Sequence, residues 1–392
     1  MPWKETCAMD QRVECLGDWL SGEYTKMQLS RIYGVSRPTI DKWIARYEHE
    51  GPAGLAERSR GRHTQAHAVS PELAQRIVEA KEQRQHWGPK KLMDRLRRLE
   101  PEVAWPADST AGEILKRAGW VRPRRRRRRV APREGALAHC QHCHQVWSTD
   151  FKGDYRLGNG QRCYPLTISD NHNRYLLACR ALARPTGAAV QPWFEWVFRE
   201  HGLPERIRSD NGAPFASLAL GGLSALAAWW VRLGIRPERI TPGTPSENGR
   251  HERMHRTLKA DAIEPPCFDL QAQQQRFDRF VEEYNHERSH ESLKRRTPGE
   301  NYVASPRPYP DKIPPVTYDT GTSVRRVRHN GEIKWNGHLV YVSGVLASEP
   351  VGLEPIETGL WEVRYSFHRL GILDERRMTI APGQGLQKAG NL

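Results

Sequence analysis

VWSTDFKGDYRL (residues 146–157) and RCYPLTISD (residues 162–170) set the architecture in the middle of this 392-residue chain. Both segments alternate apolar with polar residues, and a Gly-Asn-Gly sequence separates them, which predicts a β-hairpin. Two more strands are predicted at RYLLACRAL (174–182) and ERIRSD (205–210). The apolar residues have helical spacing in two segments, 187–202 and 223–234. A hairpin followed by alternating helices and strands indicates an α/β domain with a mixed five-stranded sheet covered by helices.

Three carboxylates stand at the ends of these elements. Asp150 lies in the first strand, Asp210 closes the fourth strand, and Glu252 lies near the start of a long helix expected from about Asn248. The ends of adjacent central strands and a nearby helix start can converge on one point of an open sheet. Carboxylates gathered there repel one another unless cations neutralise them. Two Mg²⁺ (or Mn²⁺) ions would do so, and such a pair suits phosphodiester displacement.

Each acid also has an ordinary explanation. An Asp before Asn-Gly is usually a turn former, and a single Glu on a basic helix usually forms a surface ion pair. Asp154, Asp170 and Glu247 are neighbouring acids that we assign to turns or caps. Composition alone does not choose among these carboxylates.

The helix that carries Glu252 is basic on the same face. His255 or Arg256 follows at i+3 or i+4, and Lys259 follows at i+7, so these side chains should lie beside Glu252. Arg256 and Lys259 are therefore candidate contacts to phosphates.

The charge of the chain points to a polyanion as partner. The net charge is +15, and residues 1–146 hold 28 Lys and Arg against 18 Asp and Glu. About two-thirds of the excess thus lies in little more than a third of the chain. We therefore expect residues 1–146 to be the primary binding region for nucleic acid.

Residues 25–48 predict two short helices around a tight turn. Gly34 supplies the turn, Ser36 can cap the second helix, and Pro38 is tolerated in its first turn. The expected apolar faces are Leu29, Ile32 and Tyr33 on one helix and Ile40, Ile44 and Tyr47 on the other.

That arrangement leaves Arg37, Lys42 and Arg46 facing outward, as on the recognition helix of a helix-turn-helix. We expect a helix-turn-helix DNA-binding domain over residues 1–60. The alternative is an ordinary helical hairpin with a solvated basic face.

A second helical DNA-binding unit is expected over residues 61–121. PELAQRIVEAKEQ (71–83) and GPKKLMDRLRRL (88–99) predict two helices, and a third should start at Thr110, which has Glu113 at capping-box spacing.

A basic linker, 122–144, follows. Six consecutive arginines cannot pack in a core, so they must be solvated or lie on phosphates. We expect both a flexible linker and a phosphate-binding strap at Arg124, Arg125, Arg126, Arg127, Arg128 and Arg129.

The cysteines suggest neither a zinc site nor disulfides. HCQHCH (139–144) contains Cys140 and Cys143, but a structural zinc site needs a second ligand pair, which the sequence lacks. Seven scattered cysteines do not form a disulfide framework. The polar first residues are unlike a signal peptide, and no apolar run is long enough for a membrane span. We expect a soluble, reducing, cytoplasmic setting with no membrane.

The C-terminal part predicts a second β-domain. Residues 303–320 are proline-rich and suit a stiff linker. Two Asn-Gly turns in 324–342 and alternating residues in 361–375 then predict a small β-barrel over 321–385.

Four ordered motifs carry a resemblance to a known family: VWSTDFKGDYRL, IRSDNGAPF (207–215), PGTPSENGRHERMHRTLK (242–259) and YNHERSHESLKRRTPGENY (284–302). Together they resemble the integrase catalytic core of bacterial insertion-sequence transposases, which belong with retroviral integrases in the DDE superfamily. The resemblance covers about residues 145–302. LSRIYGVSRPTIDKWIARY (29–47) is similar to the helix-turn-helix of such transposases, and the tail is similar to their small barrel.

The resemblance implies an RNase H-like fold with Asp150, Asp210 and Glu252 as catalytic acids and Lys259 as the helix lysine. The spacing departs from the retroviral pattern, because the 41 residues between Asp210 and Glu252 make a longer interval. The surplus is expected at 216–226. Glu252 is preferred to Glu247, which precedes Asn248-Gly249 and should lie before the helix.

The implied function is that of a nucleoid-associated bacterial transposase. It would bind the terminal inverted repeats of its element, cleave DNA and transfer the strand to target DNA as a homo-oligomer, with two metal ions per site. One alternative is a catalytically silent DNA-binding regulator. Another is an RNase H-type nuclease that cuts without joining.

Overall fold

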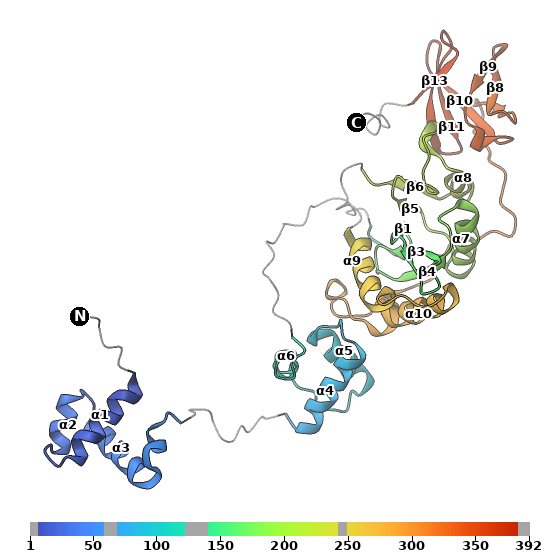
Figure 1. Cartoon of the computed structure of the whole chain (residues 1–392). Coiled ribbons are helices and arrows are strands. Elements are labelled where there is room, and N and C mark those ends of the chain that lie inside the picture. The colour runs from blue at the N-terminus through green and yellow to red at the C-terminus, as the bar shows by residue number, and fades with distance from the viewer. Residues whose placement is uncertain (1–6, 59–68, 122–139, 242–248, 383–392) are drawn as a thin grey trace. The chain divides into compact units, whose positions relative to one another are not determined.

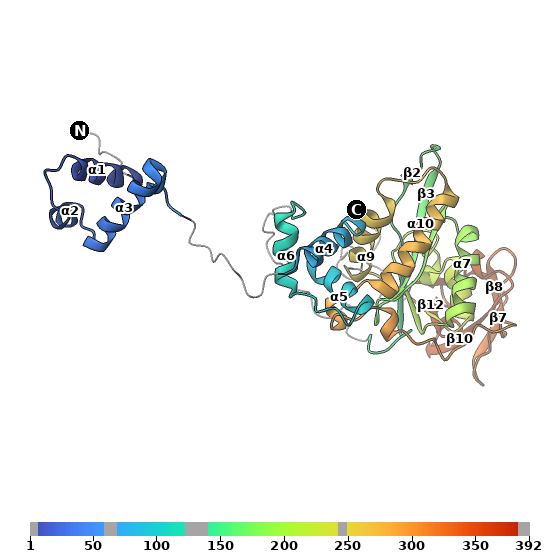
Figure 2. The ribbon, with the colours of Figure 1, turned by 90° about the horizontal axis from the view of Figure 1, so that it is seen from below.

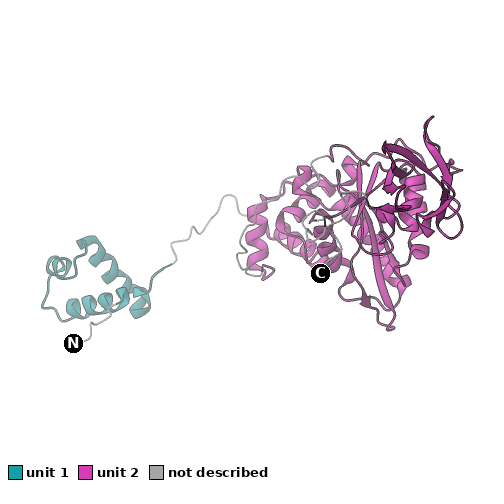
Figure 3. Cartoon of the chain, turned by 90° about the horizontal axis from the view of Figure 1, so that it is seen from above, with its two compact units in different colours: residues 1–69 teal, residues 70–392 magenta. Residues whose placement is uncertain are grey.

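The computed structural model describes residues 7–58, 69–121, 140–241 and 249–382. The chain divides at residue 69 into two compact units, coloured separately in Figure 3.

The first unit is a small helical bundle. It consists of α1 (Ala8–Leu20), α2 (Lys26–Ile32), α3 (Arg37–Glu50) and a 3₁₀ turn (Gly51–Leu55). Gly34 adopts a φ of 65° in the turn between α2 and α3, a conformation that glycine reaches without strain. The helix-turn-helix expectation is confirmed, with its core formed by Leu16, Leu29, Ile40, Ile44 and Leu55. Ile32 is the exception: it is 56% exposed, because α2 ends there and its last residue projects past the core.

The second unit begins with another three-helix bundle, α4 (Pro71–Gln83), α5 (Pro89–Leu99) and α6 (Asp108–Arg117). Its core gathers Ile77, Trp87, Leu92, Met93 and Leu115. The expected start of α6 at Thr110 is wrong. The helix begins at Asp108 after Ala107, and Arg97 bonds to both Asp108 and the carbonyl of Pro106, so a tertiary contact holds the actual start.

A mixed sheet forms the centre of this unit (Figure 1). Its strands are β1 (Val146–Phe151), β2 (Tyr155–Arg156), β3 (Arg162–Asp170), β4 (Leu176–Leu182), β5 (Arg206–Ser209) and β6 (Arg236–Arg239). β3 lies between β4 and β1, and β5 and β6 follow β1 in parallel. The predicted strands are all present, and two-residue β2 adds a sixth by pairing with the start of β3.

Helices cover both faces of the sheet. α7 (Gly187–His201) and α8 (Ala225–Arg232) bury Phe194 and Trp230 against β1 and β3. α9 (Gly249–Leu258) and α10 (Leu270–Glu282) bury Met254 and Phe277 against the opposite face. Figure 2 shows α10 running along the sheet, where Gln274 bonds to the backbone of β4 at Cys179 and Ala181.

The C-terminal segment forms an open sheet, and the predicted barrel is wrong. Its five strands lie in the order β13-β12-β11-β10-β7. They are β7 (Ser323–Arg326), β10 (Pro350–Glu357), β11 (Leu360–Tyr365), β12 (His368–Asp374) and β13 (Thr379–Ala381). β8 (Glu332–Trp335) and β9 (His338–Tyr341) pair only with each other, as the Asn336-Gly337 turn predicts. Among the described strands, no strand pairing joins the edges β7 and β13, because β8 and β9 lie against them without entering the sheet.

The open sheet packs on the domain of the central sheet instead of closing on itself. Val351 and Leu353 belong to the same hydrophobic core as Trp230 of α8. The surplus segment 216–226 contributes to this junction, since Gly221 accepts a hydrogen bond of 2.9 Å from His368 Nε2. The extra residues therefore dock the C-terminal sheet.

Candidate active site and DNA-binding surfaces

Asp150 and Asp210 lie at the same end of two adjacent parallel strands. β1 and β5 pair with Val146 opposite Arg206 and Ser148 opposite Arg208. Asp150 lies two residues beyond the last residue of β1 that pairs with β5, and Asp210 directly follows Ser209 at the end of β5. Neighbouring strands lie about 4.8 Å apart, so the two carboxylates start from closely spaced backbones.

The carboxyl of Asp150 lies within the electrostatic influence of both Asp210 and Glu252. Burial first, then the charge of Asp210 and, to a smaller extent, that of Glu252 together raise its pKa to about 7. Sequence reasoning thus chose three acids that the fold brings into one electrostatic neighbourhood. Among the described residues, no three His, Cys, Asp or Glu side chains are placed to hold one metal ion together.

A tight turn holds Asp210. Its Oδ1 accepts a hydrogen bond of 3.2 Å from the backbone N–H of Gly212, and Asn211 donates to the carbonyl of Ile240 at 3.1 Å. A Cβ at position 212 would lie 3.1 Å from Asp210 Oδ2, which is tighter than ordinary packing. Glycine therefore leaves room for the carboxylate.

Two buried histidines attach α9 to β3. The hydroxyl of Thr167 lies 2.7 Å from Nε2 of His251 and 2.7 Å from Nε2 of His255, and it donates to the carbonyl of Asp150 at 3.0 Å. A hydroxyl has one hydrogen, so both rings donate from Nε2 and leave Nδ1 unprotonated. Ser169 then donates to Nδ1 of His251 at 2.9 Å.

Burial keeps both imidazoles neutral. It lowers the pKa of His251 to about 3, and with the nearby His251 and Lys152 it lowers the pKa of His255 to about 2. Sequence reasoning missed Thr167 and His251. The available signal was the buried helical face that His251 and His255 share with Met254 and Leu258.

The outer face of α9 carries Glu252 and Arg256, both exposed, and Lys259, also exposed, directly follows the helix in a π-helical turn (Lys259–Ile263). Lys259 forms an ion pair of 3.0 Å with Glu264. His255 does not share this face, because it turns inward to Thr167.

The described neighbouring acids, Asp154 and Asp170, interact with other groups. Asp154 pairs with Arg162 at 2.7 Å. Asp170 is buried and accepts hydrogen bonds from the backbone N–H groups of His144 and His172, in keeping with a turn role. Glu247 lies outside the described residues.

The described part of HCQHCH is tied into the fold. His144 is buried, and its ring bonds to the carbonyl of Val303 and to the indole N–H of Trp147. Cys143 lies against Asn173 and Asn301, and Cys140 and Cys143 are both free thiols.

The basic surface of the first unit is organised around Trp43. The guanidinium groups of Arg12 and Arg46 lie 4.0 Å and 4.9 Å from the centre of its ring, and the ammonium of Lys42 lies 5.3 Å away. Arg37 and Lys42 are exposed on α3, as predicted. Sequence reasoning missed Arg12 and Trp43, whose contact joins α1 to α3. Arg124–Arg129 lie outside the described residues.

No helix in the described part of the chain is long and apolar enough to cross a membrane.

Four families match parts of the chain. Two, both described as "Integrase core domain", match residues 141–245 and 233–298. A "Helix-turn-helix domain" matches residues 11–63, and a "Homeodomain-like domain" matches residues 39–115.

The relatives are insertion-element proteins. An insertion element IS407 protein of Burkholderia multivorans is 26% identical over 58% of this chain and 79% of its own length. An insertion element IS476 protein of Xanthomonas euvesicatoria is 27% identical over 51% of this chain, and a putative transposase of Sinorhizobium fredii is 21% identical over 64%. The chain spans about half the length of each of these last two relatives, 56% and 54%.

Solved structures similar to this chain include the HTLV-2 integrase catalytic core domain in complex with magnesium, at a TM-score of 0.34 and 14% identity, covering 42% of this chain and 99% of that one. A simian T-cell lymphotropic virus intasome chain aligns with a TM-score of 0.36 and 16% identity, covering 76% and 97%. With helix-turn-helix and integrase core domains and insertion-element relatives, the chain is similar to insertion-sequence transposases with an integrase-type core.

Proposed function

We propose that the chain binds the terminal inverted repeats of its element and catalyses metal-dependent cleavage and transfer of DNA strands. The observation that carries this proposal is the raised pKa of Asp150, which Asp210 and Glu252 both increase. A buried carboxyl whose pKa is raised further by neighbouring carboxylates lies in a site short of positive charge, and such a site has affinity for cations.

The residues present fit divalent ions. Asp150, Asp210 and Glu252 offer oxygen ligands, which Mg²⁺ and Mn²⁺ prefer, and the role of all three as ligands is part of the proposal. Two such ions would supply charge stabilisation at the scissile phosphate and nucleophile activation at neutral pH.

The protein's own groups do the positioning. The parallel pairing of β1 with β5 would bring the two aspartates to the same edge of the sheet, and the turn at Gly212 would orient Asp210. The histidines of α9 hold Glu252 near β3 through Thr167. Arg256 and Lys259, exposed beside Glu252, would contact the DNA backbone near the reacting phosphate.

The first unit would read the element end. Arg37, Lys42 and Arg46 lie on α3, the second helix of the helix-turn-helix, which enters the major groove in this class of domain. Joining requires two element ends in one complex, so we expect a homo-oligomer on DNA.

The direct test is a strand-joining assay with Mg²⁺ and DNA that contains the element end. Asp210→Asn should lower joining by about 100-fold or more, because it removes a charge from the site. Asp154→Asn is the matched control, since Asp154 pairs with Arg162 away from the three acids. If Asp210→Asn joins strands as efficiently as the wild type does, the site is misassigned.

The alternative is a DNA-binding regulator without catalysis. The regulator would bind the element end specifically and cleave nothing with either Mg²⁺ or Mn²⁺. A nuclease of the RNase H type would instead cut without joining, so the same assay separates all three.

A further inference from the structure

The three-helix bundle α4–α6 is docked on the catalytic domain through a row of ion pairs. Arg84 pairs with Glu283 at 3.0 Å and with Glu287 at 3.2 Å, and Arg95 pairs with Glu287 at 2.6 Å. At a second place the charges are exchanged, because the catalytic domain supplies the cation: Arg295 pairs with Asp94 and Asp108 of the bundle. We call this junction the seam.

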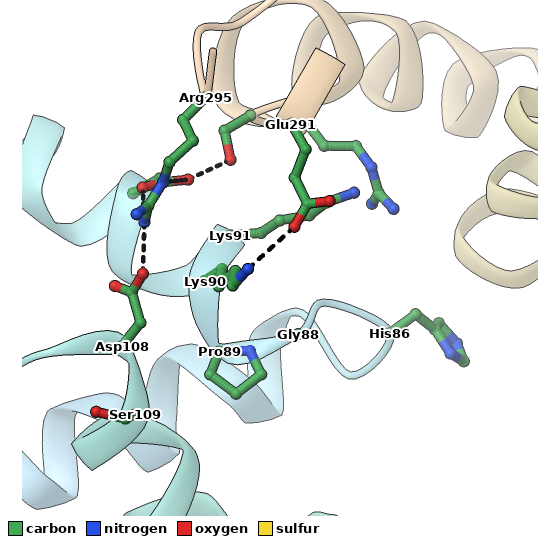
Figure 4. Close-up of a pocket in the computed structure, with 12 residues that line it drawn as sticks. His86, Gly88, Pro89, Lys90, Lys91, Asp108, Ser109, Glu291 and Arg295 are labelled. Atoms are coloured by element: carbon green, nitrogen blue, oxygen red, sulfur yellow. Dashed lines mark hydrogen bonds and ion pairs between the residues drawn. The ribbon is translucent and has the colours of Figure 1, made fainter. Parts of the chain in front are cut away.

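A cavity of about 650 Å³ opens at the seam, between the start of α5 and residues 288–295. Figure 4 shows Lys90 and Lys91 on the bundle side and Glu291 and Arg295 on the other. Arg288 also lines the cavity and is buried.

The acids that line the cavity already have cationic partners. Asp94 accepts from Arg295 and from the hydroxyl of Ser289, and Asp108 pairs with Arg295 at 2.8 Å. Glu291 pairs with Lys90 at 3.3 Å. The negative charge of the lining is therefore compensated.

Lys91 is the exception among the cations. In Figure 4 no dashed line reaches it, and its side-chain ammonium forms no hydrogen bond or ion pair with any residue that the structure describes. Burial first, then the charge of Arg288, lowers its pKa to about 8, and the opposing charges of Asp261 and Glu291 do not offset this decrease. A half-buried ammonium beside another cation is unfavourable unless something supplies negative charge.

Positive charge continues from the cavity toward α9. Burial lowers the pKa of His290 to about 3, together with the positive charges of four nearby residues, Lys91, Arg288, Arg174 and Arg253. Arg253 directly follows Glu252 on α9. The cationic field thus extends from the seam to the helix of the candidate active site.

We propose that the seam cavity binds a phosphate of the DNA backbone, with Lys91 as its principal contact. The proposal rests on the proposed function in one respect: the phosphate belongs to DNA on its way to the active site. A phosphate oxygen would give Lys91 its missing acceptor and relieve the repulsion from Arg288. The first turn of α5, which carries Lys90 and Lys91, adds the positive end of a helix dipole.

The test measures DNA binding by the full chain over a series of salt concentrations, by fluorescence anisotropy, with Ca²⁺ in place of Mg²⁺. Lys91→Gln should lower the slope of log K against log salt by about 0.9, the equivalent of one phosphate contact. Lys91→Arg should restore it. Lys90→Gln is the matched control and should change the slope less, because Lys90 is paired with Glu291.

The melting temperature separates a binding role from a structural one. Lys91→Gln should melt no lower than wild type, because it removes an unfavourable charge. An unchanged slope in Lys91→Gln, or a slope equal to that of Lys90→Gln, would overturn the proposal. So would a Lys91-dependent rise in melting temperature with inorganic phosphate while the DNA slopes stay equal, since that result assigns the cavity to free phosphate.

The two proposals fail in different ways. If wild type joins strands while Lys91→Gln keeps the wild-type slope, only the phosphate site is wrong. If no variant joins strands but the slope falls with Lys91→Gln, the phosphate site stands and catalysis is wrong.

Discussion

Nδ1 of His255 lies 3.9 Å from Oδ2 of Asp150, so the helix that carries Glu252 meets the strand that carries Asp150 at this contact. Thr167 completes the link from β3, because its hydroxyl bonds both to His255 and to the carbonyl of Asp150. The placement of Glu252 relative to Asp150 therefore depends on a buried, neutral imidazole.

Replacing His255 with alanine should weaken this link. The variant leaves a void beside Thr167 and removes a buried hydrogen bond, which costs about 1–3 kcal/mol. We expect a lower melting temperature and a larger loss in strand joining than in stability. His329→Ala is the control, because His329 is exposed. Joining and melting both at wild-type values would contradict the positioning role.

The pKa of Asp150 gives a pH dependence with a defined sign. Its folded value, about 7, exceeds the ordinary value of 3.8, so the folded protein binds an extra proton between these limits. Stability from this group is therefore lost as pH rises from about 4 to about 7. Asp150→Asn should melt higher than wild type at pH 8 in EDTA, and the difference should vanish near pH 4.

Metal addition reverses that difference if the acids hold cations. Mg²⁺ or Mn²⁺ at pH 8 should raise the melting temperature of wild type and leave Asp150→Asn unchanged. Asp154→Asn should respond as wild type does, because its carboxylate pairs with Arg162. Equal metal responses in wild type and Asp150→Asn would remove Asp150 from the ligand set.

Gly212→Ala should impair catalysis more than folding. The added Cβ would lie 3.1 Å from Asp210 Oδ2 and displace that carboxylate by a few tenths of an ångström. A shift of this size should lower strand joining by roughly 10-fold. Gly17→Ala is the control, because a Cβ there meets nothing within 4 Å. Normal joining by Gly212→Ala would mean that the position of Asp210 is not critical.

Arg46→Ala should weaken recognition of the element end. The guanidinium of Arg46 lies 4.9 Å from the ring centre of Trp43, which holds it in place on α3. We expect the affinity for an element-end duplex to fall several-fold more than for random DNA, since a base contact is worth about 1–3 kcal/mol. Arg58→Ala is the control in the same unit, where Arg58 is paired with Glu50. Equal losses on both duplexes would reduce Arg46 to a phosphate contact.

Neutral residues in place of Arg124–Arg129 should weaken binding to all DNA sequences alike. The slope of log K against log salt should flatten by up to about 0.9 for each arginine that contacts a phosphate. Titrations of element-end and random duplexes measure this directly. A loss confined to one sequence would contradict a phosphate-binding strap.

Local patterns in the sequence were enough to predict most elements. The helix at 71–83 and the strand at 162–170 appear with the expected bounds, and Gly34 and Asn336-Gly337 make the expected turns. Asp150 and Asp210 were also selected from the sequence, because they lie in or at the end of predicted strands and match the motifs of the family that the chain resembles. These features depend on neighbours within a few residues, so the sequence encodes them directly.

Contacts between distant segments were decided only by the tertiary structure. The turn of His255 toward Asp150, the pairing of Arg295 with Asp94 and the stacking of Arg12 on Trp43 each join separate elements. The C-terminal strands were likewise predicted, but their open order was not, because edge pairing depends on what each sheet packs against. Periodicity records which side chains are buried, whereas only packing in three dimensions selects the partner that buries them.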